Sequence, residues 1–236
     1  MTGLFSSFDP TMSIFSIDMS LNWAAGLIVS LSLPQSYWLV NSQFSKGALN
    51  IMYSLKKELG AVLGVSELPG TSFMFINIFL FILFSNLMGL LPYIFTSTSH
   101  LSVTLVLALP LWLGSMMWSM VFQYNSLLAH LVPLGTPAVL MPVMVLIETV
   151  SSVIRPITLS IRLAANMVAG HLLLTLLGTQ GPGLAGTALV SMILGLVLLL
   201  FLELAVACIQ SYVFTILSSL YWGELMSTNF NMKNTK

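Results

Sequence analysis

Charged and amide side chains recur through the second half of this sequence, where most other residues are apolar. They are Glu148, Arg155, Arg162, Asn166, His171, Glu203, Gln210 and Glu224. Burying a charge without a partner costs far more free energy than leaving it in water. Apolar segments that nevertheless contain such residues use them in pairs or for chemistry. These residues are therefore the candidate site.

The first arm of this set follows one face of a helix. Glu148, Arg155 and Arg162 are seven residues apart, an interval that an α-helix places on nearly the same side. Asn166 lies one turn beyond Arg162 on that side. His171 is about half a turn around from Arg162, so we expect its imidazole to point elsewhere, toward the second arm.

The second arm contains Glu203 and Gln210, which are also seven residues apart and share a helix face. An arginine guanidinium keeps its proton at every accessible pH, so Arg162 is a fixed positive charge and no link in a proton relay. Glutamate and histidine bind and release protons, especially when burial changes their pKa values. A fixed cation between titratable groups indicates a two-part proton path. A partner must then supply the carboxylate that faces Arg162.

Every candidate residue except Glu203 also has a purely structural interpretation, which the sequence leaves open. The alternative for Arg155 and Arg162 is a buried pair that serves packing, and for His171 it is a cap on backbone carbonyls. For Asn166 and Gln210 the alternative is a hydrogen bond between helices. For Glu148 and Glu224 it is a place among lipid headgroups.

Composition points to a membrane protein. Apolar residues make up 57% of the 236 positions and charged residues only 6%, whereas soluble domains carry roughly a quarter charged residues. Seven basic and seven acidic residues cancel, which argues against a nucleic-acid partner. A single cysteine, Cys208, excludes a disulfide framework or a thiolate metal cluster. No GxxxxGK[ST] phosphate loop is present, and we expect no metal and no cofactor.

Five segments are apolar and long enough to span a bilayer, which takes about 20 helical residues. They are residues 17–33, 72–91, 101–122, 138–177 and 184–221. Forty helical residues extend about 60 Å, twice the hydrocarbon thickness, so each of the last two must tilt, kink or leave the membrane. The sequence GTQGPG between them predicts a turn. The predicted fold is one all-α membrane domain over 1–236 that ends in a long, steeply tilted hairpin.

Residues 44–63 differ from these spans because their apolar side chains recur only on one helix face. That pattern predicts an amphipathic helix on the membrane surface; a solvated connecting helix is the alternative. With five spans, this helix and the C-terminus lie on the same side. The lysines outside the hairpin all fall there, which indicates the cytoplasmic or matrix side: Lys46, Lys56, Lys57, Lys233 and Lys236.

Three runs of the sequence resemble subunit a of the F-type ATP synthases. The most specific is IRPITLSIRLAANMVAGHLLLTLLG, residues 154–178, which contains the element RLAANxxAGH. The runs LELAVACIQSYVFTILSSLY at 202–221 and NLMGLLPYIFTSTSHL at 86–101 are similar to the last helix and a loop region of the family. The resemblance covers essentially the whole chain.

The resemblance implies a role for each candidate residue. Arg162 would face the essential carboxylate of a rotating ring of c subunits and separate two half-channels. The path from the outer side would be lined by Asn166, His171, Glu203 and Gln210. The path to the matrix would be marked by Glu148 and Glu224, with Arg155 near it. The chain would be non-catalytic, with the c-ring, other Fo stator subunits including the peripheral stalk, and membrane lipid as partners.

A histidine at 171 with a glutamate at 203 resembles the animal mitochondrial branch of the family. The N-terminus has no signal-peptide or transit-peptide pattern, which fits synthesis inside the organelle. The resemblance thus implies a multi-pass protein of the mitochondrial inner membrane with its C-terminus in the matrix. The main alternative is a secondary transporter or ion-coupled permease, although internal repeats typical of such folds are not found. A haem-anchoring respiratory subunit is a second alternative.

Overall fold

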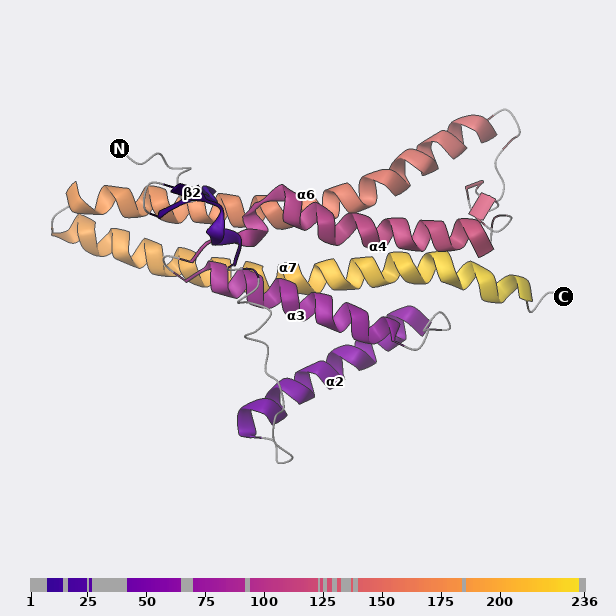
Figure 1. The fold of residues 1–236 in the computed structure, drawn as a ribbon, viewed down its shortest axis with the longest axis horizontal. Helices are drawn as coiled ribbons and strands as arrows, with labels where there is room; N and C mark the ends of the chain where they lie inside the picture. Colours follow the sequence, from indigo (N-terminus) through magenta and orange to yellow (C-terminus); the bar gives the residue numbers. More distant parts are fainter. Residues whose placement is uncertain are drawn as a thin grey trace.

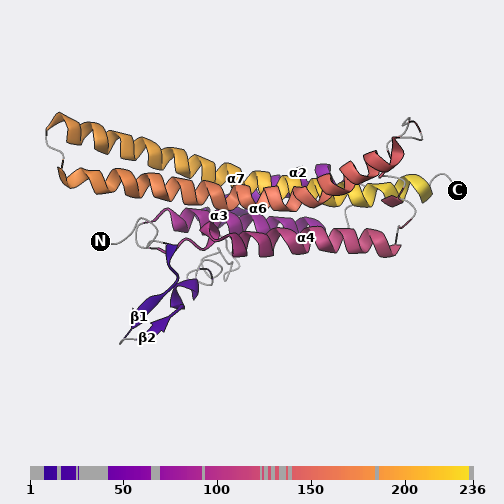
Figure 2. The same cartoon turned by 90° about the horizontal axis from the view of Figure 1, so that it is seen from above.

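Four long helices run side by side in the computed structural model of the chain and form an elongated bundle (Figure 1). They are α3 (Thr71–Gly89), α4 (Leu101–Phe122), α6 (Met141–Gln180) and α7 (Thr187–Lys233). Figure 2 shows α6 and α7 in one layer, with α3 and α4 in a second layer beneath them. The structure describes residues 8–14, 17–24, 26, 42–64, 70–91, 94–122, 124, 127–128, 131–132, 137, 140–183 and 186–233.

The outer faces of the bundle are apolar. Each of the four long helices is long and apolar enough to cross a membrane. Large apolar side chains such as Val106, Ile161 and Leu198 are exposed on α4, α6 and α7. Exposed apolar surface on this scale suits contact with lipid and would be costly in water. The prediction of an all-α integral membrane protein is confirmed.

The last two helices form a hairpin that runs the whole length of the bundle. α6 has 40 residues and α7 has 47. They are joined through the 3₁₀ helix η5 (Gly181–Gly183) and Gly186, whose φ of 66° lies in the left-handed region that glycine adopts most easily. Figure 1 shows α6 bending away from the bundle, and Pro156 lies inside this helix. A proline inside a helix removes one backbone hydrogen bond and favours such a bend.

The amphipathic helix predicted over 44–63 is α2 (Gln43–Leu63). It begins at Ser42, whose hydroxyl accepts a hydrogen bond of 3.3 Å from the backbone N–H of Ser45. Its buried residues Leu59 and Leu63 form a core cluster with side chains of α3, and Met52 and Leu55 pack against that cluster. The apolar side chains of α2 at these four positions therefore pack against the bundle. Its location on the membrane surface stays a prediction.

The first predicted span, 17–33, is wrong at its start. Residues Ile17–Met19 form strand β2, which pairs antiparallel with β1 (Met12–Ile14), and Leu21–Trp23 form the 3₁₀ helix η2. The sequence MSIFSIDM alternates polar and apolar residues with a period near two, which favours strands over helix. Residues 27–33 lie outside the described residues. Among the described residues, four helices are candidate spans.

Candidate functional site

A hydrogen bond between two amides links the arms of the hairpin. Asn166 Nδ2 on α6 donates to Gln210 Oε1 on α7 over 3.0 Å. Both residues line a small cavity that also contains Glu203 of α7 and Asn86 of α3. Its volume is about 20 Å³, enough for one water molecule. The structure thus brings Asn166 of one arm together with Gln210 and Glu203 of the other.

Glu203 is the most unusual group of this cluster. The residue is 9% exposed, and neither carboxyl oxygen has a hydrogen-bond partner among the described residues. Its carboxyl group lies directly against Gly170 of α6. A Cβ atom at position 170 would be 2.5 Å from Glu203 Oε1 and 2.8 Å from its Cδ. The missing side chain of Gly170 therefore makes the space that the carboxyl occupies.

Replacing Gly170 by alanine should displace this carboxyl. We expect the overpacking to destabilise the hairpin by about 1–3 kcal/mol. The proton flux predicted from the sequence should fall by up to about a hundredfold, because a displacement of about 1 Å in a reacting group can have an effect of that size. The measurements are thermal stability and flux in vesicles. Gly178→Ala is the matched control on the same helix, because a Cβ at Gly178 meets no atom within 4 Å.

The close contact itself can be tested with a second substitution. Glu203→Asp shortens the side chain by one methylene and should relieve part of the clash with Ala at position 170. The double variant is therefore expected to be more stable than the sum of the two single changes predicts. Strict additivity of the two changes would contradict the contact between Gly170 and Glu203.

Arg162 points away from the hairpin interior. Its side chain is exposed, and no described residue accepts a hydrogen bond from it. The neighbouring Leu163 and Met167 are buried and face the other helices. Ala165 and Ala169 are exposed beside Arg162. Such small side chains let another helix approach closely, so the guanidinium is available to a group on a partner.

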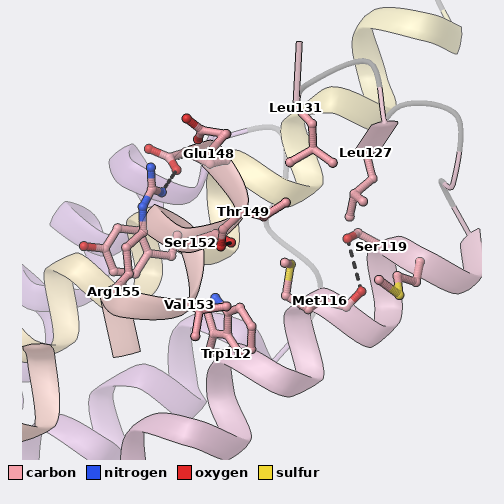
Figure 3. A pocket seen from close by; sticks show the side chains of 13 residues that line it. Trp112, Met116, Ser119, Leu127, Leu131, Glu148, Thr149, Ser152, Val153 and Arg155 are labelled. Atoms are coloured by element: carbon pink, nitrogen blue, oxygen red, sulfur yellow. Dashed lines mark hydrogen bonds and ion pairs between the residues drawn. The ribbon is translucent and has the colours of Figure 1, made fainter. Parts of the chain in front are cut away.

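A second cluster lies nearer the start of α6 and the end of α7. Arg155 Nη1 donates to Glu224 Oε2 over 2.8 Å, and its guanidinium lies 5.1 Å from the centre of the Tyr221 ring. Both members of the ion pair and Glu148 line a cavity of about 220 Å³. Figure 3 shows Glu148 and Arg155 on one side of this cavity and Leu127 and Leu131 on the other. Glu148, Arg155 and Glu224, which the resemblance assigned to one path, therefore share one cavity.

His171 lies apart from Glu203. It lines a wide cavity of about 780 Å³ near the N-terminal residues, and its ring meets that of Phe8 edge-on with centroids 6.4 Å apart. Its Nε2 atom is buried without a hydrogen-bond partner among the described residues. His171 and Glu203 line different cavities. The imidazole thus points toward the N-terminal segment, whereas we expected it to face the second arm.

Two of the polar residues that line these cavities are functional candidates that the sequence analysis did not single out. Asn86 of α3 is 1% exposed, and neither atom of its amide has a hydrogen-bond partner among the described residues. Its only sequence signal is an amide inside the apolar run FILFSNLMGLL. Asp9 lines the wide cavity with His171. It carries no sequence signal, because it lies far from the hairpin along the chain.

Comparison with known proteins identifies the family of this chain. The family model described as ATP synthase A chain matches residues 22–223. The chain is 52% identical over 225 residues to ATP synthase subunit a of Drosophila melanogaster, which covers 95% of this chain and 99% of that relative. It is 52% identical over 226 residues to ATP synthase subunit a of Anopheles gambiae and 51% identical over 226 residues to that of Aedes aegypti, with the same shares of each chain covered. The chain belongs to the ATP synthase A chain family.

Proposed function

We propose that the chain is the proton-translocating stator subunit of an F-type ATP synthase in the mitochondrial inner membrane, with its C-terminus in the matrix. The observation that carries this proposal is the position of Arg162 on α6. This exposed, fixed cation lies between two groups of polar residues. It is seven residues, about 10 Å, from Arg155 on one side. On the other side, Asn166 is one turn away.

Protons would enter through the wide cavity at His171. From there they would pass to Glu203, whose neighbours Asn166 and Gln210 and the adjoining water-sized cavity offer hydrogen-bonding groups along the way. Glu203 would then give its proton to a carboxylate of the partner ring and recover one from the His171 side. This first half-channel thus ends at the ring, and no net change remains on Glu203.

The protonated ring carboxyl is neutral, so it can turn through lipid at little cost, whereas its anion cannot. After nearly a full turn it would reach the second half-channel. Glu148 lines that cavity together with the Arg155–Glu224 pair. The carboxyl would lose its proton there toward the matrix. The ring carboxylate therefore binds its proton on one side of Arg162 and releases it on the other.

Arg162 would keep the two half-channels separate. Its guanidinium attracts the ring anion but cannot pass a proton on. A proton in the first half-channel therefore has no direct route to the second. The exposed alanines beside Arg162 leave room for the ring helix that carries the anion.

Such a subunit is non-catalytic. Moving one charge through 100 mV is worth about 2.3 kcal/mol, so several protons must contribute to each ATP made elsewhere in the complex. The partners that the proposal requires are the c-ring, the remaining Fo stator subunits with the peripheral stalk, and the lipid that meets the apolar outer faces.

The proposal is tested by comparing the isolated chain with the whole complex in vesicles. We expect ATP-driven proton pumping from the complex and no transport by the chain alone, because the ring carboxylates complete the path. A chain that transports protons or a solute without its partners would instead support the secondary transporter. A haem absorbance band in the purified chain would support the respiratory subunit.

A further inference from the structure

The wide cavity at His171 is built partly from the N-terminal segment. Phe8, Asp9, Thr11 and Asn22 line it from that segment, and Thr96 of the α3–α4 loop and Thr175 of α6 contribute further polar groups. Asp9 and His171 are the only titratable side chains among the described residues that line it. His100 lies nearby in the sequence of the α3–α4 loop, but its ring stacks with Trp23 and Phe95. The cavity therefore has one acidic group and one imidazole.

Two sets of contacts hold Asp9 in this cavity. The Phe8 ring packs edge-on against the His171 ring, which fixes the chain next to the histidine. The backbone N–H and the hydroxyl of Thr11 both donate to Asp9 Oδ1, over 3.0 and 2.8 Å. Asn22 Nδ2 donates to the backbone carbonyl of Asp9 over 3.4 Å. The second carboxyl oxygen, Oδ2, has no hydrogen-bond partner among the described residues.

These hydrogen bonds also favour the ionised carboxylate. The two bonds from Thr11 lower the pKa of Asp9 below its ordinary value. Asp9 is exposed, so water reaches it freely. An ionised carboxylate at the mouth of a cavity with low-dielectric walls raises the local concentration of cations, protons included. The negative charge therefore lines the same cavity as His171, whose Nε2 atom is buried without a hydrogen-bond partner among the described residues.

We propose that Asp9 is the outer proton-collecting group of this path, a positioning residue that delivers protons to His171. The inference rests on the proposed function and adds the N-terminal segment to it. A hydronium ion gives its proton to the carboxylate and becomes water. The carboxylate then passes that proton through water to the imidazole nitrogen and is ionised again. After His171 releases its proton, Asp9 and His171 are both back in their initial protonation states.

Asp9→Asn removes the negative charge of residue 9 and keeps its local structure. An asparagine side-chain oxygen can still accept both bonds from Thr11, so the local turn is kept while the charge is lost. Asp9→Glu restores the charge on a longer side chain. Glu58→Gln is the matched control, because it removes a carboxylate from α2, far along the chain, whose partner is the Tyr212 hydroxyl at 3.1 Å.

The experiment measures proton-driven ATP synthesis by the assembled complex in vesicles at a fixed driving force. At about pH 8 on the cavity side and low salt, we expect Asp9→Asn to be about threefold to tenfold slower than wild type, the lower part of the range for electrostatic steering. At about pH 6 protons are a hundred times more abundant, so the difference should vanish. Raising the salt concentration to about 0.5 M should also remove the difference in rate between Asp9→Asn and wild type, because salt screens an exposed charge. Asp9→Glu and Glu58→Gln should match wild type.

Two results would overturn the inference. One is wild-type synthesis by Asp9→Asn at about pH 8 and low salt. The other is an Asp9→Glu variant as slow as Asp9→Asn, which would make the residue structural. Arg162→Ala is measured in parallel. Proton-driven ATP synthesis by that variant would contradict the proposed function itself. An inactive Arg162→Ala beside an unaffected Asp9→Asn would reject only the role of Asp9.

Discussion

Replacing Arg162 by alanine should abolish ATP-driven proton pumping while the complex still assembles. The side chain is exposed and makes no hydrogen bond with any described residue, so its loss removes no contact that holds the hairpin together. What it removes is the fixed charge that, in the proposed mechanism, faces the ring anion. Charge stabilisation of this kind is worth about 3–4 kcal/mol for one donor, or at least a hundredfold in rate. Pumping in vesicles and a native gel measure the two properties separately.

The comparison needs a control on the same face of α6. Thr158→Ala is suited to it, because Thr158 is exposed one turn before Arg162 and its hydroxyl donates only to the carbonyl of Arg155, over 3.0 Å. That variant should pump normally. If the assembled Arg162→Ala complex also pumps, the cation is no barrier and the polar residues of the hairpin have a structural role.

The helical bundle and the pairing of its polar residues follow from local patterns in the sequence. Long apolar runs determine α3, α4, α6 and α7, since only a helix satisfies its own backbone in lipid. The interval of seven residues places Glu148 and Arg155 on one face of α6, and the structure puts them in one cavity. These features depend on spacing along one helix, which the sequence displays directly.

Contacts between distant segments could not be predicted in the same way. Gly170 of α6 leaves room for the carboxyl of Glu203 on α7, a contact that spacing along one helix does not reveal. Asn86 reaches the same cavity from α3, and Asp9 reaches His171 from the N-terminal segment. Each depends on how separate elements pack. The strands at 12–14 and 17–19 were missed for another reason, because an apolar stretch downstream outweighed a short alternating pattern.

Replacing Glu203 by glutamine should separate function from stability. Glutamine has nearly the same shape but cannot bind and release a proton, so proton flux should fall at least about a hundredfold, the lower end of the contribution of a proton-transferring group. Stability should hold or rise, because neither oxygen of the buried carboxyl has a partner among the described residues. Removing a buried ionisable group without partners relieves a desolvation cost. Pumping and thermal unfolding of the assembled complex are the measurements.

Two further variants make this outcome decisive. Glu203→Asp keeps a titratable carboxyl one methylene shorter and should retain part of the flux. Cys208→Ala, an exposed change on the same helix, should retain all of it. If Glu203→Gln lost flux only in proportion to lost assembly, the carboxyl would be holding α6 and α7 together. Its contact with Gly170 would then be a packing feature, and proton transfer from the His171 side would need another acceptor. Full flux with unchanged stability would exclude both roles, whereas lost flux in a stable complex leaves proton exchange as the function of Glu203.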